Sequence, residues 1–353
     1  MSNKDLLNDE MGRRISAVMA WVKSNGFLAG LLGMVGLAWL LPDLGAQGGL
    51  FRSELARPIA VFLIFFIQGM ALPTEDFRRG VTQLNLHSFV LSWNYLAFPL
   101  IIWIGLHWGG AFLRPELRFG FLYLAILPTT ITSAVFFTSV GRGDVAGAVF
   151  STTISNLASV FLVPMGVAML LVDGAGSDVS IQTMFLKLCK LIILPMFIGQ
   201  CLRPFLKFIF PLLKPWFKRT TTASIFFIMY CTFCDGVRRA AWEQLGWGAV
   251  AVAFVGALAI LLIASALVWW TSGWLSLSPK GRVAAYFCGS QKSLATGVPM
   301  AASIFPIGGT VASIPDISVI VLPLMCYHFL QLAMATHIAN RFARRSDAGP
   351  ISN

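Results

Sequence analysis

The chain has 353 residues, of which 57% are hydrophobic and only 12% are charged, and its mean hydropathy is +0.77. A soluble domain would have about 25% charged residues, so this composition excludes an ordinary soluble protein and is typical of a membrane protein. The formal net charge is +11, but the basic residues lie between apolar runs, which indicates orientation in a membrane and not binding to nucleic acid.

The opening segment, residues 1–25, differs from the rest of the chain. Apolar residues recur at helical spacing from Leu6 to Val22, while Lys4 and Arg13 fall on the opposite face. This pattern predicts a cytoplasmic amphipathic helix that lies on the membrane surface. A cleaved signal peptide is the alternative, and it fits less well because acidic and basic residues precede the first apolar run.

Ten apolar runs follow, each compatible with a membrane-spanning helix. Their limits are about 27–42, 56–72, 86–108, 119–140, 144–171, 181–202, 221–235, 247–273, 283–305 and 317–340. The sequence therefore predicts an all-α polytopic membrane protein with ten transmembrane helices. We expect a single transmembrane domain over residues 26–341 and a cytoplasmic tail over 342–353.

The distribution of lysine and arginine predicts the orientation of these helices. Outside the apolar runs, 17 basic residues fall on one side of the predicted membrane and 6 fall on the other. The side with more basic residues is normally cytoplasmic. We therefore expect a multi-pass protein of the cell membrane with both termini in the cytoplasm.

Ten spans divide into two units of five, at about residues 26–172 and 180–341. A second unit that follows an odd number of spans enters the membrane from the opposite side, so the division predicts two inverted repeats. A weak sequence echo agrees with it, because Phe-Phe-Ile precedes an Arg-Arg pair in the second span and again in the seventh.

The fourth span of each unit is interrupted by polar residues and helix breakers. The first interruption runs over residues 127–134 and contains Pro128, and the second runs over 288–299 and contains Gly289 and Pro299. Irregular backbone at membrane depth is tolerated only where protein or a wet cavity covers it. Paired interruptions in corresponding positions of two halves point to the binding site of a transporter.

Lys292 lies inside the second interruption, about ten residues past Arg282. At 1.5 Å per residue this is roughly 15 Å, about half of the hydrocarbon core. A lysine at that depth faces a cavity or a partner, or else it reaches toward an interface from a displaced helix. A fixed cation at the binding site and a titrating amine both remain open readings of this residue.

Three stretches together resemble the bile acid:sodium symporter family. Residues 68–78 resemble its GMxLxxxDF signature, residues 128–164 resemble its first crossover helix and the helix that follows, and residues 289–294 resemble the second crossover. The sequence is most similar to the divergent branch of sodium/bile acid cotransporter seven type, which is SBF-like. The resemblance implies a panel domain and a core domain with crossed discontinuous helices, as in sodium/proton antiporters.

The resemblance also implies two sodium sites, and the sequence departs from both. Three ligand positions carry residues without a side-chain oxygen: Phe287, Ala134 and Ala148. The ligand positions that keep a polar group are Ser133, Thr152, Gln291 and Asn94, and one further asparagine position carries Lys292. The resemblance therefore still implies one sodium site, at Gln291 and Asn94. The ammonium group would stand in for a second cation.

These observations predict a secondary active, symporter-like transporter that moves a small organic anion across the lipid bilayer by alternating access. We expect no enzymatic activity and no cofactor, unless Na⁺ is coupled. The residues expected to hold substrate or ion are Asn94, Thr129, Thr130, Thr132, Ser133, Thr152, Ser290, Gln291, Lys292 and Ser293. Two other functions compete with this one: a cation/proton antiporter that uses Lys292, and a membrane regulatory protein without transport.

Overall fold

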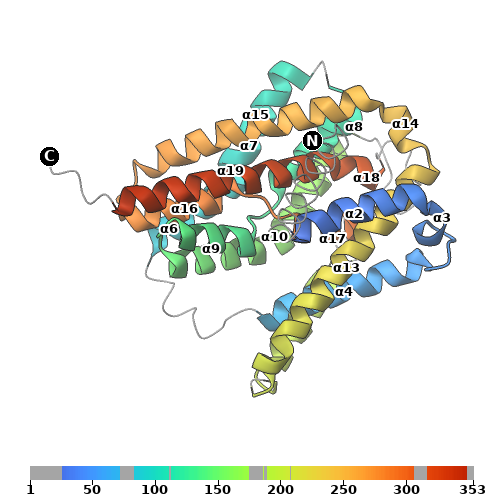
Figure 1. The fold of residues 1–353 in the computed structure, drawn as a ribbon, viewed down its shortest axis with the longest axis horizontal. Helices are drawn as coiled ribbons and strands as arrows, with labels where there is room; N and C mark the ends of the chain where they lie inside the picture. Colours follow the sequence, from blue (N-terminus) through green and yellow to red (C-terminus); the bar gives the residue numbers. More distant parts are fainter. Residues whose placement is uncertain are drawn as a thin grey trace, which may run out of the picture.

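The computed structural model describes residues 26–71, 83–110, 113–174, 186, 189–206, 208–305 and 316–347, and all regular elements within these ranges are helices (Figure 1). The expected amphipathic segment at residues 1–25 lies outside them. At the other end the last helix continues to Asp347, so part of the segment expected as a tail is helical.

The first half of the chain forms helices that correspond to the first five apolar runs. They are α2 (Gly26–Leu40), α3 (Pro42–Gly45), α4 (Ser53–Ala71), α6 (Leu84–Ser92), the π-helix η1 (Trp93–Ala97), α7 (Phe98–Gly109), α8 (Pro115–Ile126), α9 (Ile131–Val140) and α10 (Val145–Gly174).

The second half forms a comparable series. Its helices are the π-helix η3 (Cys189–Ile193), α12 (Leu194–Leu202), α13 (Phe210–Arg238), α14 (Ala241–Leu245), α15 (Trp247–Ser272), α16 (Pro279–Ser290), α17 (Leu294–Ile304), α18 (Ile317–Ile320) and α19 (Leu322–Asp347).

Fewer of these helices qualify as complete membrane spans than the ten apolar runs predicted. Among the described residues, five helices are long and apolar enough, and a sixth span results if α8 and α9, bent by 62°, are taken together. The segments Ala29–Leu40 and Lys190–Leu202 are apolar but shorter. By length and composition the described residues therefore support a multi-pass membrane protein with five or six spans.

The helices pack in two groups. In one group α13 lies against α2, α3 and α4, and α4 also packs against α12. In the other, α15 lies against α16 and α19, while α9 packs against α10, α16 and α19. Figure 1 shows α2, α4 and α13 together on one side of the molecule and α15, α16 and α19 side by side on the other. Helix α17 contacts α4 and α13 as well as α19, so it lies between the groups.

Two features hold the first group together. Glycines let α4 and α12 approach backbone to backbone: a Cβ at Gly69 would lie 2.9 Å from the Cα of Met196, closer than real Cβ atoms approach. The fully buried Arg57 on α4 also forms an ion pair with Asp235 on α13. A buried charge needs such a partner, because an unpaired one would be expensive in an apolar interior.

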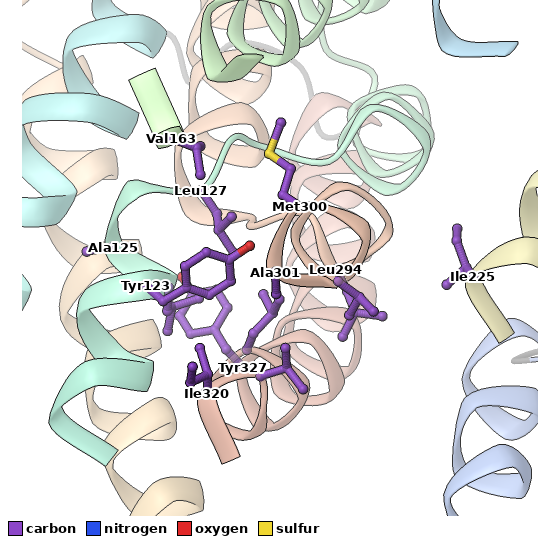
Figure 2. Close-up of a cluster of buried hydrophobic side chains, with 14 of the residues drawn as sticks. Tyr123, Ala125, Leu127, Val163, Ile225, Leu294, Met300, Ala301, Ile320 and Tyr327 are labelled. Atoms are coloured by element: carbon purple, nitrogen blue, oxygen red, sulfur yellow. The ribbon is translucent and has the colours of Figure 1, made fainter. Parts of the chain in front are cut away.

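The second group closes around the ends of α8 and α17. Tyr123 and Leu127, both fully buried, lie beside Met300 and Ala301 of α17 (Figure 2). The Tyr123 hydroxyl donates a 2.6 Å hydrogen bond to the Gly297 carbonyl. This packing positions the two broken helices against each other.

Candidate functional site

The interruption between α8 and α9 follows from Pro128. Helix α8 ends at Ile126 and α9 begins at Ile131. Proline has no N–H, so Pro128 cannot donate to the Leu124 carbonyl and continue the helix. Leu127, the residue before the proline, is extended at φ −74° and ψ 151°, which is the conformation that a following proline favours.

The interruption between α16 and α17 covers Gln291–Ser293. Gln291 and Ser293 both have extended backbone angles. Ser293 starts the new helix as its N-cap, because its Oγ accepts a 3.2 Å hydrogen bond from Thr296 N. The Gln331 side chain of α19 satisfies both peptide groups of Lys292: it accepts from Lys292 N at 2.8 Å and donates to Lys292 O at 2.9 Å.

Gly289 and Pro299, expected as break residues, lie inside helices. Gly289 belongs to the last turn of α16, and it is packed closely, since a Cβ there would lie 2.9 Å from Trp93 Cδ1. Pro299 lies within α17. The break forms between them because Ser293 and Gln331 satisfy the non-helical backbone there, so neither the glycine nor the proline is needed to interrupt the helix.

The two interruptions touch. Ser293 N donates to the Pro128 carbonyl at 2.9 Å, and Ser133 Oγ donates to Gln291 Oε1 at 2.6 Å. Asn156 of α10 joins the same two segments: its Nδ2 donates to Thr129 O at 2.8 Å, and its Oδ1 accepts from Thr296 Oγ1 at 3.0 Å.

Lys292 is fully buried at this contact, with 0% of its surface exposed. Its Nζ donates to three backbone carbonyls, those of Leu127 at 2.7 Å, Ala125 at 3.1 Å and Asn94 at 3.2 Å. It also lies 4.1 Å from the centre of the Phe98 ring, within the range of a cation–π contact. No described carboxylate forms an ion pair with it.

The three carbonyls are free because two prolines interrupt the helical hydrogen-bond pattern: Pro99 lacks the N–H that would donate to Asn94 O, and Pro128 ends α8 before the Ala125 and Leu127 carbonyls can be paired. In η1 the N–H of Phe98 donates to Trp93 O, and the next donor in the π-helical pattern would be Pro99, which has none. Asn94 O is therefore left without a backbone partner. The Ala125 and Leu127 carbonyls are left free where Pro128 ends α8.

Three further polar atoms at the crossover are buried and have no hydrogen-bond partner within the described part of the chain: Asn94 Oδ1, Thr129 Oγ1 and Gln291 Nε2. Such groups are rare in folded proteins and need an explanation, such as a bound water, ion or ligand. The orientation of the Asn94 amide is fixed, because its Nδ2 already donates to Val90 O and Cys288 O. Its oxygen therefore remains an available acceptor.

Most of the predicted site residues come together here. Those at the crossover are Asn94, Thr129, Thr130, Ser133, Ser290, Gln291, Lys292 and Ser293. Among the described residues, the side chains of the other two predicted residues form no hydrogen bond with either interruption. The Thr152 hydroxyl donates to the carbonyls of Ala148 and Val149 in its own helix, and Thr132 is exposed on α9.

The residue list drawn from the sequence omitted several groups that build the site. Gln331 and Asn156 bridge its segments, Phe98 contacts the ammonium group, and Tyr327 donates to Ser290 O at 2.8 Å. Gln331 is a polar residue inside the last apolar run, and that position is a signal that the sequence does contain. Pro99 is another such signal, because it leaves the Asn94 carbonyl without a backbone donor. The lysine that donates to this carbonyl, Lys292, lies far away in the chain.

An apolar cavity of about 450 Å³ lies between the two helix groups. It is lined mainly by hydrophobic residues of α2, α13, α15, α17 and α19, among them Leu31, Phe233, Leu294 and Phe329. His328 is a polar residue of its wall, and its Nδ1 lies 2.8 Å from Gln331 Nε2. The cavity wall is therefore linked by hydrogen bonds to the backbone of Lys292.

A multi-pass helical protein with two broken helices in contact has the architecture of a secondary transporter. Residues 25–344 match the SBF-like CPA transporter family, and the chain belongs to this family. The resemblance seen in the sequence is thereby confirmed.

The relatives span nearly the whole chain. YfeH of Escherichia coli (strain K12), provisionally named a symporter, is 33% identical over 91% of this chain and 93% of its own. Protein PA2026 of Pseudomonas aeruginosa is also 33% identical, over 92% of this chain and 94% of its own length. Sodium/bile acid cotransporter 7 of Rattus norvegicus is 28% identical, over 89% and 91%.

Proposed function

We propose that this protein is a secondary active transporter that moves a small organic anion across the cell membrane by alternating access. The observation that carries the proposal is the contact between the two broken helices. It brings a buried cation, an uncapped helix start and unpaired polar atoms to one place. The proposal includes ten membrane-crossing segments in two inverted repeats, with both termini in the cytoplasm.

The electrostatics of the crossover favour an anion. Lys292 brings one positive charge with no described carboxylate to balance it. Helix α9 begins at Ile131, and its N-cap Thr130 makes no side-chain capping hydrogen bond, so the first N–H groups of α9 remain available to a negative group. Thr129 Oγ1 and Gln291 Nε2 are unpaired donors at the same place.

The adjoining cavity favours a substrate with an apolar body. Its volume of about 450 Å³ lies in the range of small-molecule sites. It also lies between the two helix groups, where relative movement would open and close it. An amphipathic organic anion, of which a bile acid is one example, would place its apolar part there and its negative group toward the crossover.

A cation/proton antiporter that uses Lys292 fits the geometry less well. An ammonium group has three N–H donors, and three carbonyls accept them. Loss of a proton would leave one of these buried carbonyls without a donor. A regulatory protein without transport has no specific observation in its favour.

A binding titration on purified protein tests the proposal. Bile acids and smaller mono- and dicarboxylates are added to wild type and to Gln291→Leu, which removes the unpaired amide donor. We expect at least one anion to raise the thermal stability of wild type saturably, and the apparent Kd to rise about tenfold or more in the variant, since a hydrogen bond to a charged group is worth about 1.5–3 kcal/mol. Gln244→Leu, at an exposed position on α14, is the control. Equal affinity in all three proteins would contradict the assignment of the site.

A further inference from the structure

We infer that the Lys292 ammonium group is a tethered cation, which occupies a coordination site that a free monovalent cation would otherwise fill. The wild-type protein then binds no sodium ion at this position. The inference rests on the proposed function and deepens it, because it says which group supplies the positive charge at the same site.

The ligand set is of the kind that binds a hard cation. Three carbonyl oxygens converge from two separate segments, the π-helix η1 and the broken end of α8. Neutral oxygen ligands suit alkali and alkaline-earth ions. In this chain the same oxygens accept hydrogen bonds from Nζ, and a metal ion cannot share them with an ammonium group at hydrogen-bond distance.

The residues that would make a separate sodium site here do not complete one. Asn94 Oδ1 is an available oxygen, whereas Gln291 Oε1 has one of its two lone pairs taken by the hydrogen bond from Ser133. Within the described ranges, no group of three His, Cys, Asp or Glu residues could hold a metal ion. A sodium ion beside the buried ammonium group would also meet like charge, which is strongly unfavourable in a medium of low dielectric constant.

The charge at the site is therefore supplied by the chain itself and does not depend on the ions in solution. An anionic substrate would meet the same positive charge whether or not sodium is present. Because the charge is covalently held, it also cannot leave when the site opens to the other side of the membrane.

Chemical rescue of Lys292→Ala tests this inference. The substitution removes the ammonium group and three methylene groups, so n-propylammonium fits the space that is left. We expect the variant to melt below wild type. n-Propylammonium chloride should then raise its melting temperature saturably, sodium chloride should do so to a smaller extent, and choline chloride and 1-propanol should not.

The matched control is Met300→Ala, which truncates another fully buried side chain of the same region without freeing the three carbonyls. It should lose stability and show no response to either cation. If n-propylammonium and 1-propanol act equally on Lys292→Ala, or if Met300→Ala responds as strongly, the inference is wrong.

Wild type provides a second measurement that does not require the variant to fold. Its melting temperature should be the same in sodium chloride and in choline chloride of equal ionic strength. A saturable stabilisation by sodium alone would overturn the inference. Because these readouts are stability and binding, they are independent of whether any anion is transported, so failure of the proposed function would be seen separately in the anion titration.

Discussion

At the scale of single residues, the crossover depends on side chains that satisfy backbone groups left free by the broken helices. Lys292 does this for three carbonyls, and Gln331 does it for the N–H and C=O of Lys292 itself. Asn156 and Ser293 complete the set. These residues are therefore required by the irregular backbone, whatever substrate the site takes.

Gln331 gives a direct test of that requirement. Gln331→Met keeps the length of the side chain but leaves one buried N–H and one buried C=O without partners. Each such group costs about 1–3 kcal/mol, so we expect the free energy of unfolding to fall by about 2–6 kcal/mol, as measured by denaturation in detergent. Gln244→Met, at an exposed position, is the control. If the two variants have the same free energy of unfolding, the amide of Gln331 does not stabilise the break.

At the scale of helices, packing decides where the chain can be altered. The α4–α12 contact is close because Gly69 faces the backbone of Met196, whereas nothing lies within 4 Å of a Cβ at Gly33 on α2. The same substitution should therefore have opposite effects at these two helical positions. Both substitutions reduce the conformational freedom of the unfolded chain, but only at Gly69 does the added methyl group meet a rigid neighbour.

We expect Gly69→Ala to destabilise the protein by about 1–3 kcal/mol, the usual cost of overpacking. Gly33→Ala should leave stability unchanged or raise it by up to about 1 kcal/mol, because alanine favours the helix. Thermal unfolding of both variants measures the difference. A loss of stability at Gly33 equal to that at Gly69 would contradict the packing described for α4 and α12.

The sequence predicted an all-helical membrane protein and the interruption at Pro128 for a local reason. Pro128 and the polar runs around it are strong signals that act within a few residues of themselves. The partners of Lys292 could not be predicted in the same way, because its acceptors lie more than 160 positions away in the chain. The misplaced break residues, Gly289 and Pro299, show the same limit: whether a glycine or proline interrupts a helix depends on what packs against it.

At the scale of the whole molecule, two helix groups meet at α17, and the apolar cavity lies between them. This arrangement is suited to movement of one group relative to the other, because the crossover residues belong mainly to one of them. The proposed orientation in the membrane places the α14 region outside the cell and the start of α16 in the cytoplasm.

Cysteine labelling in intact cells tests that orientation. In a background without the native cysteines, a membrane-impermeant thiol reagent should label Gln244→Cys in α14. It should label Lys280→Cys in α16 only after the membrane is opened. Both positions are exposed in the structure, so a difference in labelling reports the side of the membrane. The reverse pattern would contradict the orientation derived from the basic residues.

The most direct test of the central claim is anion uptake by proteoliposomes in sodium chloride and in choline chloride. The claim is that the crossover holds an organic anion next to a cation supplied by the chain itself. It predicts saturable uptake of an anion identified by titration, at the same rate in both media, and lost in Gln291→Leu. Uptake that requires sodium, or a Gln291→Leu variant that transports as wild type does, would contradict it.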